Sequence, residues 1–152
     1  MTKRKTVIVD LDGTIALNEH RHHYIYPKNG SKPDWNSFFL ACIDDTPNMA
    51  VIHSIEAFKK SGYKIHIMSA RGMIAHKETV DWLSKFSITY DELTMRNIGC
   101  YKPDEELKQY WIEKLYPNYQ EDILCVFDDR DKVVNMWRSL GLTCFQVAEG
   151  DF

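Results

Sequence analysis

The sequence lacks long hydrophobic runs and a strong excess of either charge. Its longest apolar runs have about the length of a strand, so we expect no segment that spans a membrane. The 152 residues include 19 lysines and arginines against 22 aspartates and glutamates, a net charge of -3 at pH 7. This balance argues against a generally basic nucleic-acid-binding surface, although it leaves room for a local basic groove.

Cysteines are few and carry no paired spacing. The four are Cys42, Cys100, Cys125 and Cys144, and they lack the pairs that a zinc site or a disulfide framework requires. We therefore predict free thiols in a reducing compartment. The first strand-like run starts at residue 5, which leaves no room for a signal peptide, so we expect a cytoplasmic protein.

What the sequence does contain is a regular alternation of strand-like and helix-like segments. Hydrophobic residues make up 44% of the chain, enough for one domain with a core. Apolar runs predict strands at 5–10, 63–69, 92–96, 122–127 and 143–147. Helices are predicted from Thr46-Pro47 to Gly62, at 75–86, between Pro103 and Pro117, and at 131–140. This order predicts an α/β fold, a Rossmann-like three-layer sandwich with a central, mostly parallel sheet.

Residues 16–45 interrupt the alternation with a polar, aromatic and turn-rich segment. An insertion after the first strand lies beyond the carboxyl end of the sheet, where open parallel sheets bind ligands. We predict a single domain over 1–152, with a core of 1–15 and 46–152 and a small cap of 16–45 that contains a short helix, Trp35 to Cys42. Five cap aromatics are expected to form its own small core, with a base-stacking role open for a tyrosine. They are Tyr24, Tyr26, Trp35, Phe38 and Phe39.

The first strand ends in two closely spaced carboxylates, Asp10 and Asp12, followed by Gly13 and Thr14. Alternate strand residues point the same way, so the two carboxylates can converge on one small volume. Such a pair requires a cation, a shared proton or a phosphoryl-transfer role. A calcium loop of the EF-hand type is excluded, because the glycine stands fourth rather than sixth. Helix capping is a poor alternative after so apolar a strand.

Further polar residues follow the other predicted strands. Ser69 and Arg71 follow the second strand, Asp128 and Asp129 follow the fourth, and Lys108 lies on the helix before it. Clustered carboxylates without histidine or cysteine favour Mg²⁺ over zinc, and neighbouring lysine and arginine favour phosphate. The sequence therefore predicts a magnesium and phosphate site at the carboxyl edge of the sheet.

Simpler interpretations exist for several of these residues. Asp104 and Lys108 have the i,i+4 spacing of an ordinary surface ion pair, and Lys102 competes for the role of the phosphate-contacting lysine. The histidines of the cap, at 20, 22 and 23, are predicted to be exposed loop residues rather than metal ligands. His66, inside a strand, is predicted to be a core histidine with hydrogen-bond partners.

Together these motifs resemble the haloacid dehalogenase superfamily of phosphotransferases, through Asp10-x-Asp12-Gly-Thr, Ser69, Lys108 and Asp128-Asp129. One branch is closer, the 3′-phosphatase domain of phage-type polynucleotide kinase–phosphatases. The residues that carry this closer likeness are Arg21, Ser69-Ala70-Arg71, the spacing Arg96…Asp104…Lys108, the run Asp128-Asp129-Arg130 and the tail Gln146–Phe152.

The resemblance implies a role for each matching residue. Asp10 would be the nucleophile, and Asp12 the general acid and base. Ser69 and Lys108 would contact the phosphate. The substrate would be bound by Arg21, Arg71, Asp104 and Thr14. The Mg²⁺ ligands would be Asp10, Asp12 through its backbone carbonyl, Asp129 and Asp128.

The implied activity is that of a Mg²⁺-dependent phosphomonoesterase with an aspartyl-phosphate intermediate, first of all a polynucleotide 3′-phosphatase in the repair of DNA or RNA ends. A nucleoside or deoxynucleoside 5′-monophosphate phosphatase is the alternative. A receiver-like phospho-acceptor module is a more distant alternative, because the Asp pair here follows the first strand. An inactive binding domain is also more distant, because every expected catalytic residue type is present. The substrate is thus expected to be a nucleotide or oligonucleotide end. The chain has no P-loop motif, so we expect any kinase or ligase partner to be a separate polypeptide.

Overall fold

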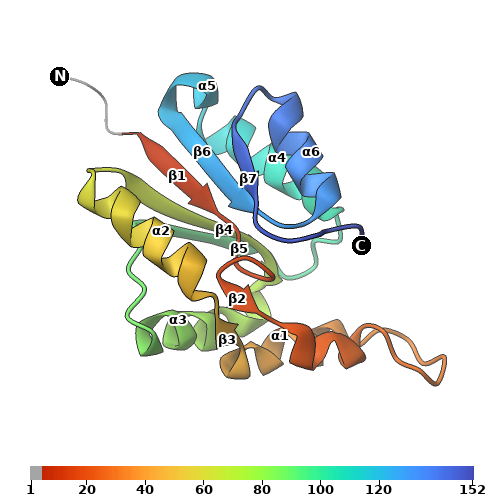
Figure 1. Cartoon of the computed structure of the whole chain (residues 1–152). Coiled ribbons are helices and arrows are strands. Elements are labelled where there is room, and N and C mark those ends of the chain that lie inside the picture. The colour runs from red at the N-terminus through yellow and green to blue at the C-terminus, as the bar shows by residue number, and fades with distance from the viewer. Residues whose placement is uncertain (1–4) are drawn as a thin grey trace.

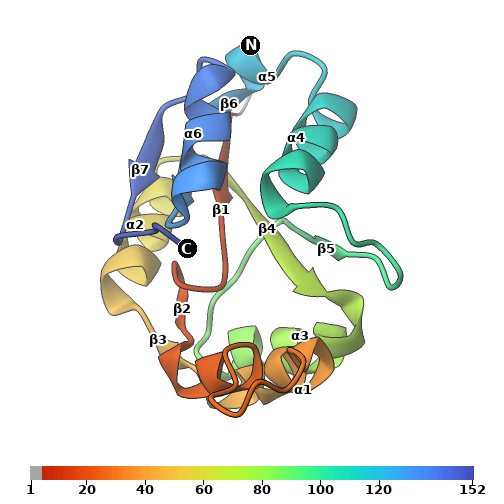
Figure 2. The same cartoon turned by 90° about the vertical axis from the view of Figure 1, so that its right-hand side faces the viewer.

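The computed structural model describes residues 5–152, which form a three-layer α/β sandwich (Figures 1 and 2). Within these residues, five parallel strands make one sheet in the order β5-β4-β1-β6-β7. The strands are β1 (Thr6–Val9), β4 (Lys64–Gly72), β5 (Glu92–Arg96), β6 (Ile123–Asp128) and β7 (Cys144–Gln146). The predicted fold class is confirmed, and the strand that delivers Asp10 is the central one.

Helices cover both faces of the sheet because its strands are apolar on both sides. Val7 and Val9 pack with α2 (Met49–Lys60) and α3 (His76–Lys85), whereas Ile8 packs with α4 (Asp104–Leu115) and α6 (Asp131–Ser139). A single turn, α5 (Tyr119–Asp122), precedes β6. The buried β1 therefore fixes the position of the loop that follows it.

The segment predicted as a cap leaves and rejoins the core through a two-stranded antiparallel ribbon, β2 (Ala16–Leu17) and β3 (Thr46–Pro47). Between them lie η1 (Glu19–Tyr24), α1 (Trp35–Leu40) and η2 (Ala41–Asp44). Trp82 of α3 donates a hydrogen bond from Nε1 to the Asp45 carbonyl at 2.9 Å. The cap segment thus rests on α3, beyond the carboxyl ends of the strands (Figure 2).

Several predicted boundaries were wrong. Thr46 and Pro47 do not open a helix, since they pair with β2. The strand predicted to end at residue 69 continues to Gly72, because a register shift after Ser69 lets Gly72 pair with Arg96. The cap helix stops at Leu40, and the chain continues as the 3₁₀ turn η2. A further 3₁₀ turn, η3 (Met73–Ala75), precedes α3.

The prediction of a cap core holds for only some of its aromatics. Phe38 is buried at 5% exposure, but Trp35 is 52% exposed and Tyr26 is 60% exposed. A helix of six residues has one buried stripe, which Phe38 occupies. Trp35 and Tyr26 are therefore surface residues.

Predictions about single buried residues were more accurate. All four cysteines are free, and Cys42, Cys125 and Cys144 are buried. His66 is 1% exposed and hydrogen-bonds the hydroxyls of Tyr116 and Thr94, each at 2.7 Å, as a core histidine should. In the part of the chain that the structure describes, no helix combines the length and apolar character needed to cross a bilayer. The expectation about a signal peptide concerns residues 1–4, which lie outside the described residues.

Candidate active site

The loop after β1 turns sharply and brings the Asp10 and Asp12 carboxylates to the sheet edge. Asp10 still belongs to the sheet ladder, since its backbone N–H donates to the Phe127 carbonyl at 2.9 Å. Gly13 then adopts a positive φ of 79°, which side chains disfavour. A β-carbon at residue 13 would lie 2.1 Å from Oδ2 of Asp129. Glycine at this position therefore allows the turn and the close approach of Asp129.

The Asp10 carboxylate is held from both sides. Lys108 Nζ donates to Asp10 Oδ1 at 2.8 Å, and the Thr14 hydroxyl donates to Oδ2 at 3.0 Å. The same ammonium group also donates to Oδ2 of Asp128 at 2.9 Å, which Trp137 Nε1 contacts at 3.1 Å. All three side chains of this ion-pair group are buried. Lys108 thus points inward from α4 and does not pair with Asp104.

This cluster shifts the pKa of its members strongly. Burial raises the pKa of Asp10 well above its usual range, the charge of Asp128 adds to the shift, and Lys108 opposes it. Burial and Asp128 also raise the pKa of Asp129, to about 6. Burial alone would lower the pKa of Lys108, but Asp10 and Asp128 raise it above its usual range. The carboxylates therefore have too little positive charge around them.

The residues of this cluster fit a divalent cation. Asp10, Asp128 and Asp129 each place a carboxylate oxygen within 4.8 Å of those of the other two. Three carboxylates face one ammonium group, so a doubly charged cation would balance the cluster. An oxygen-only set of donors suits Mg²⁺ rather than zinc. The ligand roles predicted for these residues, and for the backbone carbonyl of Asp12, remain predictions.

The Asp12 carboxylate belongs to a different group of side chains. Oδ1 accepts hydrogen bonds from Nη2 of Arg21 and from Nη2 of Arg71, the latter at 2.5 Å. Asp45 accepts from Arg21 at 2.8 Å and 2.7 Å, and Arg71 lies 3.4 Å away. His20 Nε2 makes a further contact with Asp45 at 2.7 Å. Both arginines are therefore committed to carboxylates, and their predicted contact with substrate stays a prediction.

Two guanidinium groups give Asp12 the opposite electrostatic environment to Asp10. Burial alone would raise the pKa of Asp12, but Arg71 and Arg21 outweigh it and hold that pKa far below its usual range. At neutral pH, Asp12 is therefore ionised, the protonation state of a general base, and the same two arginines make it a weak base as long as they contact it.

Asp104 takes part in a third group of charges. It accepts from Arg96 Nη2 at 2.7 Å and from Arg130 Nη1 at 3.0 Å. Arg96 also donates to the Ala70 carbonyl at 3.0 Å and to the Lys102 carbonyl at 2.7 Å. This group ties the end of β4 to the loops after β5 and β6, and the substrate-binding role predicted for Asp104 stays a prediction.

Lys102 stays at the surface, where its ammonium group lies 4.9 Å from the centre of the Tyr110 ring. Lys108, not Lys102, reaches the Asp10 carboxylate. Ser69 is buried, and its hydroxyl accepts a hydrogen bond from the Arg71 backbone N–H at 3.1 Å. The remaining cap histidines have local partners, His22 with Asn18 and His23 with a backbone carbonyl.

Asp45 is the residue of this site that sequence reasoning missed. It is 3% exposed and is the common partner of Arg21, Arg71 and His20. The only signal was its place as the last residue of the interrupting segment, where the chain rejoins the core. An acidic residue there is ordinary in a loop, so the pattern gave no reason to select it.

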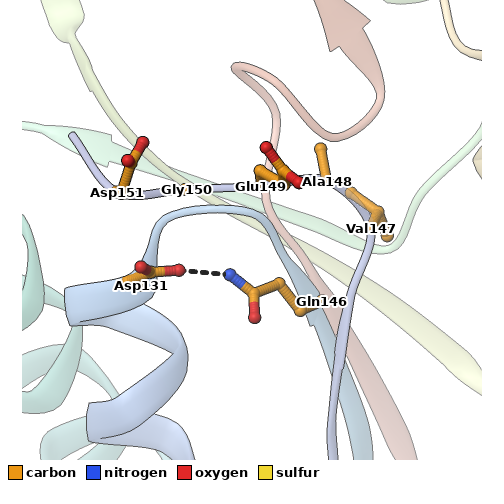
Figure 3. Close-up of a pocket in the computed structure, with 7 residues that line it drawn as sticks. All are labelled: Asp131, Gln146, Val147, Ala148, Glu149, Gly150 and Asp151. Atoms are coloured by element: carbon orange, nitrogen blue, oxygen red, sulfur yellow. Dashed lines mark hydrogen bonds between the residues drawn. The ribbon is translucent and has the colours of Figure 1, made fainter.

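Residues 146–151 border a hollow of about 440 Å³ beside the start of α6 (Figure 3). Gln146 Nε2 donates to Asp131 Oδ1 at 2.6 Å and to the Asp129 carbonyl at 2.9 Å. Carboxylates of Asp131, Glu149 and Asp151 line the hollow, and none of its lining residues is basic. Like charge opposes a phosphate there.

The chain tail also packs tightly against the backbone of the site. A β-carbon at Gly150 would lie 1.9 Å from the Asp129 carbonyl oxygen, and the Gly150 carbonyl accepts from the Asp131 N–H at 2.7 Å. The tail therefore supports the loop that carries Asp129.

Similarity to known proteins agrees with this geometry. The family model of the polynucleotide kinase PNKP phosphatase domain matches residues 4–152. A candidate bifunctional polynucleotide kinase/RNA ligase of Autographa californica nuclear polyhedrosis virus is 31% identical over 149 residues, which cover 94% of this chain and 19% of the relative.

Solved structures extend the likeness. A chain of the Pnkp1/Rnl/Hen1 RNA repair complex is 34% identical, with a TM-score of 0.80, over 98% of this chain and 44% of that chain. A candidate phosphatase from Clostridium difficile shares the fold at 14% identity, with a TM-score of 0.64, over 95% of this chain and 85% of its own. The chain thus spans about a fifth of the viral relative and less than half of the repair-complex chain.

The match over nearly the whole chain shows the family, and the Asp-x-Asp loop, the inward lysine and the paired aspartates at the end of β6 agree with it. The chain belongs to the family of PNKP phosphatase domains and is a phosphatase of the haloacid dehalogenase superfamily.

Proposed function

We propose that this phosphatase removes the 3′-phosphate from the end of a polynucleotide, with Mg²⁺ as cofactor and an aspartyl-phosphate intermediate. The observation that carries the proposal is the position of Asp10, fixed between Lys108 and Thr14 beside two further carboxylates. The family match and the 34% identity to a chain of an RNA repair complex support a nucleic-acid end as substrate.

In the first step, an oxygen of Asp10 attacks phosphorus while the bond from phosphorus to the sugar oxygen breaks. Lys108 and Thr14 orient the Asp10 carboxylate for this attack. Asp12 supplies a proton to the leaving oxygen. Since the two arginines hold Asp12 deprotonated, this acid role requires substrate binding to weaken their contact with Asp12.

In the second step, Asp12 accepts a proton from water as the water attacks phosphorus, and the bond to Asp10 breaks to release phosphate. Ser69 would donate a hydrogen bond to a phosphate oxygen, and the Lys108 ammonium would balance its charge. Asp10, Asp128 and Asp129 would hold Mg²⁺, which supplies charge neutralisation for the transferring group.

A substrate panel tests the proposal. Phosphate release is measured with and without Mg²⁺ for 3′-phosphorylated DNA and RNA oligonucleotides, nucleoside 3′-monophosphates and nucleoside 5′-monophosphates. We expect the highest kcat/KM for a 3′-phosphorylated oligonucleotide, and no release above background by Asp10→Asn. Turnover confined to 5′-monophosphates would refute the proposal.

The wider setting of the reaction is proposed by analogy. The viral relative is named for a polynucleotide kinase and an RNA ligase activity, and we propose by analogy that such activities act on the same ends as this phosphatase. The free thiols are consistent with action in the reducing cytoplasm.

A further inference from the structure

Two large aromatic side chains lie open on the cap segment. Tyr26 and Trp35 are both more than half exposed, whereas Phe38 between them is buried. Trp35 lies edge-on to the Phe38 ring, with 5.8 Å between the ring centroids. Tyr26 lies edge-on to His22, whose ring is 6.4 Å from that of Phe38. The two exposed rings therefore belong to one continuous aromatic group.

Lysines accompany these rings, although the chain as a whole is acidic. Lys28 and Lys32 are exposed on the loop that joins η1 to α1. Between residues 20 and 43 there is one carboxylate side chain, Asp34, which accepts hydrogen bonds from the backbone and hydroxyl of Ser37. Glu19, Asp44 and Asp45 lie just outside this stretch, so the excess of positive charge is confined to the loop of residues 25–33, which carries both lysines and no acidic residue.

The aromatic group is directly connected to the proposed active site. The Phe38 carbonyl accepts a hydrogen bond from Arg21 Nη1 at 3.0 Å, and Arg21 also binds Asp12. Trp35 is thus linked to Asp12 through two residues, Phe38 and Arg21. The loop that carries Lys28 and Lys32 projects on the same side of the molecule as the C-terminus (Figure 1) and lies in front of the cap in Figure 2.

We infer that Tyr26, Lys28, Lys32 and Trp35, named here the cap surface, bind the single strand that leads to the 3′-phosphate at Asp10. This inference rests on the proposed function and names the part of the substrate that the cap recognises. Aromatic faces stack on bases of any sequence, and lysines contact the phosphates between them, a combination typical of single-strand binding. A mononucleotide has no upstream bases or phosphates to occupy such a surface.

Steady-state kinetics with substrates of increasing length tests the inference. We expect wild-type kcat/KM to rise from a nucleoside 3′-monophosphate to a 3′-phosphorylated strand of several nucleotides. Trp35→Ala should raise KM for the strand on the order of tenfold and leave the mononucleotide unchanged. Lys28→Ala/Lys32→Ala should reduce the salt dependence of kcat/KM for the strand, by about 1.4 in log–log slope. Trp35→Phe should largely restore the strand KM, because it keeps an aromatic face.

Matched controls come from elsewhere on the surface. Tyr101 is 92% exposed on the loop after β5, and Lys5 is exposed at the opposite end of the sheet. Tyr101→Ala and Lys5→Ala should leave strand kinetics unchanged. The inference would be overturned if Tyr101→Ala reduced kcat/KM for the strand as much as the cap variants do. It would also be overturned if no cap variant changed kcat/KM for the strand, which is the result expected if the cap surface instead contacts a protein.

A binding measurement separates this inference from the proposed function. Fluorescence anisotropy of a labelled single-stranded oligonucleotide requires no turnover, and Asp10→Asn serves as the parent protein. Weaker binding in Trp35→Ala on that parent would support the cap surface even if no substrate of the panel were hydrolysed. Unchanged binding, with hydrolysis of 3′-phosphorylated ends intact in the active protein, would overturn the cap surface alone.

Discussion

Asp10 and Asp12 lie two residues apart in one loop, yet their surroundings are opposite. Around Asp10, three carboxylates share one ammonium group, that of Lys108. Around Asp12, two carboxylates face two guanidinium groups. Arg21 and Arg71 each form ion pairs with both Asp12 and Asp45. The first group comes from the core elements β1, α4 and β6, and the second from the cap segment and β4. One motif is therefore divided into a half that lacks positive charge and a half that is already balanced.

This difference assigns the two carboxylates different chemistry. A carboxylate with a raised pKa and a deficit of positive charge is suited to a neighbour that brings positive charge, such as a divalent cation, and that cation can in turn attract an anionic phosphoryl group. A carboxylate with a lowered pKa stays ionised, and the two guanidinium groups that hold it so must loosen before it takes up a proton. Changing the basic residue beside Asp10 should therefore affect the protein differently from changing a basic residue beside Asp12.

The largest effect is expected from Lys108→Met, which leaves Asp10 and Asp128 buried without their ammonium partner. Breaking a buried ion pair on one side costs about 3–5 kcal/mol. We expect a loss of this size in the free energy of unfolding without Mg²⁺, a partial recovery with Mg²⁺, and turnover near background. Chemical denaturation measures it.

Lys102→Met is the matched control, since Lys102 is exposed over the Tyr110 ring. Its unfolding free energy should change by less than about 0.5 kcal/mol. Equal effects of the two substitutions would contradict the role given to Lys108.

A smaller effect, on activity rather than stability, is expected from Arg71→Lys. Lysine keeps the charge but loses the fork that contacts Asp12 and Thr79 together. The pKa of Asp12 should move up toward its usual range, and kcat/KM should fall by about 10–100-fold. The acid limb of the pH–kcat profile, which includes the hydrolysis step in which Asp12 accepts a proton, should shift to higher pH. A fall in activity without a shift of the acid limb would show that the acid limb does not report the titration of Asp12.

The smallest effect concerns the pH dependence of stability through Asp129. Its pKa is raised in the folded state to about 6, so the folded protein binds a proton that the unfolded chain has released above pH ~4. This contribution to stability falls as pH rises from about 4 to 6, on the order of 1–2 kcal/mol. Mg²⁺ should reduce the loss.

Thermal unfolding between pH 4.5 and 7, with Mg²⁺ or with a chelator, measures this dependence, and Asp129→Asn is its control. A wild-type profile that matches that of Asp129→Asn in the chelator would show that Asp129 does not titrate in this range.

The sequence predicted the sheet and the positions of the strand-end residues because both depend on local pattern. The apolar run at Ile123–Phe127 identifies a buried strand, and Asp128 and Asp129 must then lie at its end. The partners of these residues were harder to predict. Asp104 and Lys108 are spaced for a mutual ion pair, but the fold directs Lys108 inward and gives Asp104 to Arg96 and Arg130.

Asp45 could not have been found in this way. Its selection as the partner of Arg21 depends on the β2–β3 ribbon, which is only two residues long on each side, and on the packing of Trp82 against the end of the cap. Neither leaves a periodic signal. The exposure of Trp35 was missed for a related reason, since aromatic residues in a short insertion look the same whether they face inward or outward.

The close packing of Gly150 against the Asp129 carbonyl has a consequence for how tolerant the chain is to mutation. Residue 150 carries no functional group and lies more than a hundred residues from Asp10 in sequence. Its backbone nevertheless packs so closely on the loop of Asp129 that a side chain there would displace this loop. A screen of random substitutions scored by lost phosphatase activity would therefore identify residue 150 alongside the aspartates. We therefore expect the positions most sensitive to substitution to include one where a side chain has to be absent.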